Sequence, residues 1–75
     1  NSMDRRVAAF LLEEAAIQAA DRLPITHESI ANHLGTHREV VTRILRYLQS
    51  EGMVRLTRGA VELTDRAKLE TLGSE

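Results

Sequence analysis

Between residues 38 and 49 the chain carries polar side chains that can form directional hydrogen bonds with nucleic-acid bases. At about 100° per helical residue, six of them fall within an arc of roughly 140°: Arg38, Glu39, Thr42, Arg43, Arg46 and Gln49. An arginine can donate two hydrogen bonds to O6 and N7 of guanine, and a glutamate can accept one from N4 of cytosine. This face therefore predicts contacts with base edges in a DNA groove.

The opposite side of the same segment is apolar and is expected to lie in the core, with Val41, Ile44, Leu45 and Leu48 as its buried residues. We expect this helix to run from about residue 37 to residue 51, where Gly52 ends it.

A shorter predicted helix precedes it. Thr26 is a good N-cap, Glu28 places an acidic group in the first turn, and Gly35 is the residue type that stops a helix. Ile30, Ala31 and Leu34 share the inward side. Two helices joined by a glycine turn predict a helix-turn-helix, in which the second helix enters the major groove.

The flanking segments are predicted to support this pair of helices. Residues 53–57 and 60–63 alternate apolar and polar types around Arg58-Gly59, a pattern that predicts a β-hairpin. A hairpin directly after a helix-turn-helix is a wing. A final short helix is expected from a cap at residues 64–65 to about residue 72.

The first part of the chain predicts a helix from Asp4 to about Ala20, with Val7, Phe10 and Leu11 on one side, widened by Leu12, Ala16 and Ile17. Pro24 biases the residue before it toward extended backbone and closes this helix. Ile25 is then expected to begin a very short third strand. The expected fold class is α+β, a small winged helix-turn-helix: helix, short strand, helix-turn-helix, hairpin and short C-terminal helix.

Length and composition set limits on function. Residues 1–75 make one small domain that is 43% hydrophobic and 28% charged, an ordinary balance for a globular protein. Asn1-Ser2-Met3 is expected to be a cloning remnant without a structural role. Because the sequence has no apolar run of about 20 residues, we expect no membrane span, and we also expect no leader peptide and no membrane contact. The absence of cysteine suits a reducing compartment, and a cytoplasmic location is expected.

The net charge of −1 argues mildly against nucleic-acid binding, because non-specific affinity depends on neutralising phosphates. The distribution of charge matters more, because the arginines gather on the second helix of the pair while acidic residues gather on the first helix and the tail. A locally basic face is therefore compatible with an acidic chain.

Several segments at fixed spacing resemble the DNA-binding domain of the Crp/Fnr family of bacterial transcription regulators. They are Ile25-Thr26, Ile30-Ala31 to Leu34-Gly35, Arg38-Glu39, Val41-Thr42-Arg43-Ile44-Leu45, Leu48 and Gly52-Met53-Val54. The first helix and the ending Val61-Glu62-Leu63 with Asp65-Arg66-Ala67-Lys68-Leu69 also look like that family, so the likeness covers nearly the whole chain.

The resemblance implies that this chain is the output domain of a dimeric regulator whose N-terminal sensor domain is absent here. In the family's pattern, Arg38, Glu39 and Arg43 would contact bases, and a TGTGA-like half-site would be expected. It also implies double-stranded DNA as the partner, a homodimer in the full-length protein, RNA polymerase as a further partner, and no cofactor in this domain.

Six other residues are expected to position the domain on DNA phosphates: Thr26, His27, His37, Thr42, Arg46 and Arg58. Two positions depart from the family's pattern. His37 stands where a serine or threonine usually caps the helix, and Val40 stands where a threonine is common. Both substitutions remove a hydroxyl that would help to hold a phosphate.

Simpler interpretations of the same residues remain open at this stage. The arginine face could be a solvated helix surface, and Arg46 could bond within its helix to Gln49 or Ser50. Glu39 fits a capping box with Thr36, in which it would read no base. Arg58 and Arg55 could be ordinary polar residues of the hairpin, and Thr26 could be a cap alone.

Other classes of function are less well supported. Three histidines, His27, His33 and His37, could suggest metal binding or a response to pH, but Gly35 separates the last two and no thiolate completes a set. No phosphate-cradling glycine loop and no nucleophilic triad is present, so we expect no enzymatic activity. The rival hypothesis is a winged helix that binds protein and not DNA.

Overall fold

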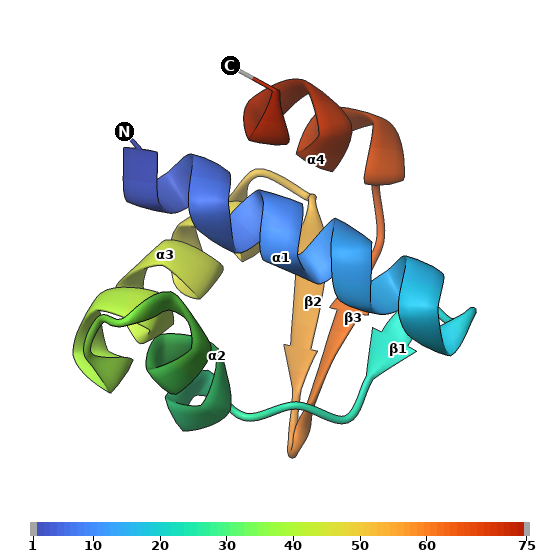
Figure 1. The fold of residues 1–75 in the computed structure, drawn as a ribbon. Coiled ribbons are helices and arrows are strands. Elements are labelled where there is room, and N and C mark those ends of the chain that lie inside the picture. The colour runs from blue at the N-terminus through green and yellow to red at the C-terminus, as the bar shows by residue number, and fades with distance from the viewer. Residues whose placement is uncertain (1, 75) are drawn as a thin grey trace.

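The apolar residues follow helical spacing in four segments and alternate in the hairpin, and the computed structural model, which describes residues 2–74, has those elements. In chain order they are α1 (Ser2–Gln18), β1 (Arg22–Leu23), α2 (His27–Leu34), α3 (Arg38–Ser50), β2 (Val54–Thr57), β3 (Ala60–Leu63) and α4 (Arg66–Gly73). The expected winged helix-turn-helix fold is confirmed (Figure 1).

The sheet is antiparallel, with strand order β1-β3-β2, so β3 is its centre. The third strand was expected at Ile25, and this prediction is wrong because Leu23 pairs with Val61 instead. Leu23 is fully buried, and Pro24, which has no backbone N–H, ends the ladder immediately after it. The amide of Ile25 donates back to the Leu23 carbonyl at 2.9 Å, which turns the chain toward α2.

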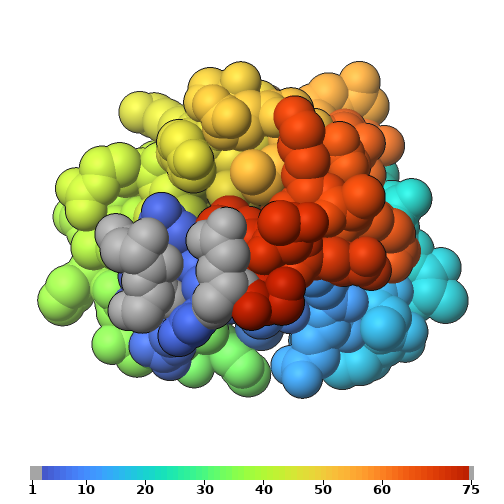
Figure 2. Space-filling model, turned by 90° about the horizontal axis from the view of Figure 1, so that it is seen from above, coloured from blue at the N-terminus to red at the C-terminus, as the bar shows by residue number. Residues whose placement is uncertain are grey.

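A single apolar cluster joins the elements. Its largest fully buried side chains come from every helix and from β1 and β3: Leu11, Leu23, Ile30, Leu45, Leu48, Leu69, Val7, Val41 and Val61. Helix α1 crosses the sheet, with α4 on one side of it and the α2–α3 pair near its N-terminal half (Figure 1). On the face in Figure 2, α4 lies beside the end of α3.

Helix α1 differs from its prediction at both ends. Its buried stripe is Val7, Ala8, Leu11 and Ala15, whereas Ile17, expected inside, is 71% exposed. The helix ends at Gln18, and Ala19 takes a φ of 52°. At about 100° per residue, Ile17 lies on the side of the helix away from Val7, Leu11 and Ala15, so it faces outward. At the other end, Met3 was expected to have no structural role but packs against the core. Asn1 lies outside the described residues.

Candidate nucleic-acid interface

Helix α2 begins with a reciprocal pair of hydrogen bonds between Thr26 and Ser29. The Ser29 amide donates to Thr26 Oγ1 at 3.0 Å, and the Thr26 amide donates to Ser29 Oγ at 3.2 Å. The expected N-cap is confirmed, but the box formed by Ser29 was missed, since serine replaces the usual glutamate or glutamine at this position. The Thr26 amide therefore already donates to Ser29, and the Thr26 hydroxyl is the group left to donate to a phosphate.

Gly35 sets the angle between the two helices of the motif. Its φ of 71° is the left-handed conformation expected of a glycine just past a helix end. The next amide, that of Thr36, donates to the Ala31 carbonyl at 2.9 Å and closes the turn. Helix α3 then begins at Arg38 with His37 as its N-cap.

The buried face of α3 is the predicted one. Val41, Ile44, Leu45 and Leu48 are all buried, so the remaining faces of this helix point outward. Five side chains of the outward arc line one hollow of about 550 Å³: Arg38, Glu39, Thr42, Arg43 and Arg46. Three guanidinium groups against one carboxylate make this surface positive although the chain carries a net −1.

Glu39 does not form the capping box that was the rival interpretation of its role. The N-cap of α3 is His37 and not Thr36, so Glu39 is the second helical residue and not the third. Within residues 2–74 it makes no side-chain hydrogen bond to the backbone, and the cap has none from any side chain. Its carboxylate therefore lies in the hollow with acceptor atoms available.

His27 and Thr42, both expected to contact phosphates, are in contact with each other. His27 Nδ1 lies 2.8 Å from Thr42 Oγ1, which joins the first turn of α2 to the middle of α3. Burial lowers the pKa of His27 below its ordinary value of 6.5, and the positive charges of Arg38 and Arg46 lower it further. The imidazole is therefore neutral at pH 7 in the protein without DNA.

The other residues expected on phosphates are all exposed. His37 is exposed at the start of α3, and Arg58 is exposed at the turn between β2 and β3. Arg46 lies in the hollow and makes no bond to Gln49 or Ser50. Arg55 donates through Nε and Nη2 to Glu62 Oε1, across the hairpin from it.

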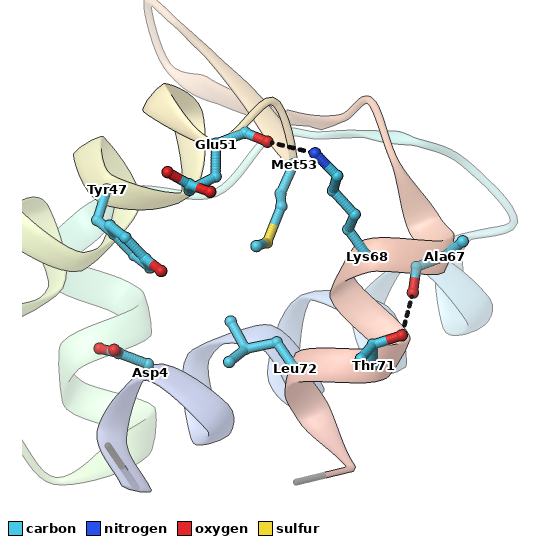
Figure 3. A pocket seen from close by; sticks show the side chains of 8 residues that line it. All are labelled: Asp4, Tyr47, Glu51, Met53, Ala67, Lys68, Thr71 and Leu72. Carbon is cyan, nitrogen blue, oxygen red and sulfur yellow. Dashed lines mark hydrogen bonds between the residues drawn. The ribbon is translucent and has the colours of Figure 1, made fainter.

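A second hollow, of about 490 Å³, lies between the end of α3, the start of α1 and α4 (Figure 3). Its wall includes the carboxylates of Asp4 and Glu51 and a single ammonium group, that of Lys68. Lys68 Nζ donates to the Glu51 carbonyl at 3.1 Å, which caps the C-terminal end of α3. With two carboxylates against one ammonium, this hollow does not match a phosphate backbone.

Within the described part of the chain, no three histidine or acidic side chains come together to hold a metal ion. No helix among those residues is long and apolar enough to cross a membrane.

Comparison with known proteins gives a consistent result. A family model described as the Crp-like helix-turn-helix domain matches residues 5–72. The cyclic AMP receptor protein of Thermus thermophilus is 40% identical over 89% of this chain and 31% of its own length. The nitrogen fixation regulation protein FixK of Bradyrhizobium diazoefficiens is 34% identical over 97% of this chain and 34% of its own length.

Solved structures agree with these matches. A transcriptional regulator of the crp/fnr family from Eubacterium rectale superposes on the whole chain with a TM-score of 0.97 and 57% identity, over 35% of its own length. The catabolite activator protein of Thermus thermophilus gives a TM-score of 0.80 and 36% identity over 95% of this chain and 34% of its own. This chain thus spans about a third of the length of the relatives it matches.

Proposed function

The chain belongs to the Crp-like helix-turn-helix family, the DNA-binding domains of transcription regulators, and we propose that it reads a specific duplex sequence by placing α3 in the major groove. The observation that carries this proposal is the division of α3 into two faces. One face is buried in the core, and the other presents three arginines and a glutamate in one hollow.

Base reading is proposed for Arg38, Glu39 and Arg43. The two guanidinium groups suit guanines, and the unbonded carboxylate of Glu39 suits the N4 amino group of cytosine. The family likeness of this trio supports a TGTGA-like half-site. The absence of a capping bond at Glu39 supports its part in this role, because a tied carboxylate would have no acceptor to offer.

Phosphate contacts are proposed for Thr42 and Arg46, which line that hollow, and for four residues outside its lining: Thr26, His27, His37 and Arg58. His27 and Thr42 act as a pair in this proposal. If the Thr42 hydroxyl donates to Nδ1, the neutral imidazole carries its proton on Nε2, which then donates to a phosphate oxygen. Arg58 reaches a phosphate from the wing.

The remaining parts of the proposal concern the longer protein of which this chain would be the C-terminal domain. Two copies in a homodimer would present their α3 helices to half-sites about 34 Å apart, one turn of the duplex. The sensor for any effector would lie outside residues 1–75, and this domain would need no cofactor. We further propose a cytoplasmic location and RNA polymerase as a protein partner.

Binding to a TGTGA-type duplex tests the proposal. The chain, dimerised through a fused coiled coil, is titrated against the duplex over a series of salt concentrations, and the observed affinity should fall steeply with salt. Arg43→Ala should lose about 1–3 kcal/mol of discrimination at one base pair. The matched control is Arg66→Ala, an exposed arginine of α4 outside the hollow, which should change discrimination little.

Absence of binding even at low salt, with a dimer that is folded, would contradict DNA reading. That result would favour the rival hypothesis of a winged helix that binds protein. Selection of bound sequences from a random duplex library would then test the half-site without assuming its sequence.

A further inference from the structure

Gln49, in the last turn of α3, is bonded to the wing. Its side-chain oxygen Oε1 accepts a hydrogen bond from the backbone amide of Leu56, in β2, at 2.7 Å. The sequence pattern grouped Gln49 with the outward arc of the helix that carries Arg38 and Arg43. The structure instead turns its amide group toward the hairpin.

The register of the hairpin explains why the Leu56 amide needs a partner outside the sheet. Thr57 and Ala60 flank a two-residue turn and form the first pair, so the next pair, Leu56 and Val61, is of the non-hydrogen-bonded kind. The Leu56 amide therefore points away from β3. Because β2 is an edge strand in the order β1-β3-β2, no further strand lies on that side.

Arg22 Nη1, in β1, donates to Thr57 Oγ1 at 3.2 Å and ties the tip of β2 to the sheet itself. Toward α3 and α4, the other hydrogen bonds of the hairpin are at its base. The Met53 amide donates to the Leu48 carbonyl at 2.9 Å, and the Thr64 hydroxyl donates to the Gly52 carbonyl at 2.9 Å. Both lie at the ends where the hairpin joins α3 and α4. The Gln49–Leu56 bond reaches further along β2, to a residue two positions before Arg58 at the tip.

We propose that Gln49 is a positioning residue, which holds the wing at a fixed angle to α3 so that Arg58 and the arginines of the helix meet DNA as one rigid surface. The DNA part of this inference rests on the function proposed above. The mechanical part does not, because it concerns the free protein.

Two substitutions at position 49 distinguish the effect of losing the hydrogen bond from the effect of changing the size of the side chain. Methionine has nearly the same length but only a weak acceptor, and glutamate keeps a strong one.

Amide hydrogen exchange in the free protein tests the mechanical part. Gln49→Met should speed the exchange of the Leu56 amide about tenfold or more, while Gln49→Glu should leave it near the wild-type rate. The Arg55 amide is the internal control, since Arg55 pairs with Glu62 inside the hairpin and should keep its rate in both variants. Equal Leu56 exchange in the wild type and in Gln49→Met would overturn the proposal.

A double-mutant cycle tests the DNA part. Gln49→Met should weaken DNA binding by about 2-fold to 10-fold, the range expected for one hydrogen bond. Arg58→Ala should cost less in that background than in the wild type, because a wing that is not held presents its arginine less often. Additive losses would overturn the positioning role. In Gln49→Glu, which keeps a strong acceptor, Arg58→Ala should again cost as much affinity as in the wild type. Ser50→Glu is the control for the added negative charge.

The two proposals fail in different ways. If the wild type binds no DNA, the proposed function fails, and Leu56 exchange still decides whether Gln49 holds the wing. If the wild type binds DNA and Leu56 exchange is indifferent to Gln49→Met, only the positioning role is lost.

Discussion

Replacement of Glu39 by glutamine separates base reading from helix capping. Glu39 is the second residue of α3 and has no side-chain bond to the cap, so its contribution to stability is limited to the attraction between its charge and the helix N-terminus. For an exposed carboxylate that attraction amounts to about 0.3–1 kcal/mol. Loss of a true cap would cost about 1 kcal/mol more.

Glu28→Gln is a matched control for this experiment. Glu28 is also the second residue of its helix, α2, and also acidic in the first turn, so its loss removes a similar electrostatic attraction. Each kcal/mol shifts Tm by about 4–8 °C in a domain of this size. The two variants should therefore unfold within a few degrees of each other in a thermal scan.

DNA binding should distinguish the two variants. A set of duplexes, each with one base pair of the half-site changed, is used to compete against the parent duplex. Glu39→Gln should lose preference at a single base pair by about 1–3 kcal/mol, or about 5-fold to 150-fold, and keep preference elsewhere. Glu28→Gln should keep the whole pattern. If Glu39→Gln keeps every preference and loses much more stability than Glu28→Gln, Glu39 caps the helix and the reasoning is refuted.

Three further predictions concern single residues. Gly35→Ala should destabilise the domain by about 1–2 kcal/mol in urea unfolding, because an alanine is strained in the left-handed backbone conformation of residue 35. The new Cβ would meet no atom within 4 Å, so a steric clash would not add to this cost. The control, Gly73→Ala, lies in a helix and should gain up to about 1 kcal/mol. Because the pKa of folded His27 is lowered, the unfolded chain binds the proton more readily, so stability should fall as pH falls below about 6.5 toward the folded pKa. His27→Gln should flatten that dependence in urea titrations across this range. Arg58→Ala should lower DNA affinity equally for all sequences and reduce the salt slope by about 1.

Each of these has a clear contrary result. Equal stability of Gly35→Ala and the wild type would mean that the turn relaxes without the left-handed residue. A pH dependence unchanged in His27→Gln would assign it to other groups. A loss in Arg58→Ala that is confined to one base pair would make this residue a base reader.

The helix-turn-helix could be predicted from sequence because its signals are local. Gly35 and Thr26 mark helix ends by backbone chemistry alone, and both are confirmed as a C-cap and an N-cap. The separation of apolar and charged residues on α3 is also local, and all of its predicted core residues are buried. The hairpin follows from alternation around a glycine turn in the same way.

The features that sequence reasoning missed depend on contacts between distant segments. The third strand lies at Leu23 and not at Ile25, because Leu23 pairs with Val61. The residues around position 25 do not by themselves predict which of them pairs with β3. Gln49 turns away from the outward arc because the edge amide of β2 lies within its reach. In both cases a contact with a segment distant in the sequence decided the outcome, and local spacing did not specify that contact.

The charge of the chain and the charge of its proposed interface have opposite signs, and this difference bears on how binding would be achieved. A net −1 gives the whole domain little long-range attraction to a polyanion, so non-specific affinity should be weak. The arginines of the α3 hollow act within a Debye length, roughly 8–10 Å at physiological salt, and most strongly at contact, where base geometry matters. A second copy on the same duplex would raise the affinity of such a domain, because the second binding event becomes intramolecular. In the dimer proposed above, base contacts that give specificity would therefore act together with salt-dependent phosphate contacts.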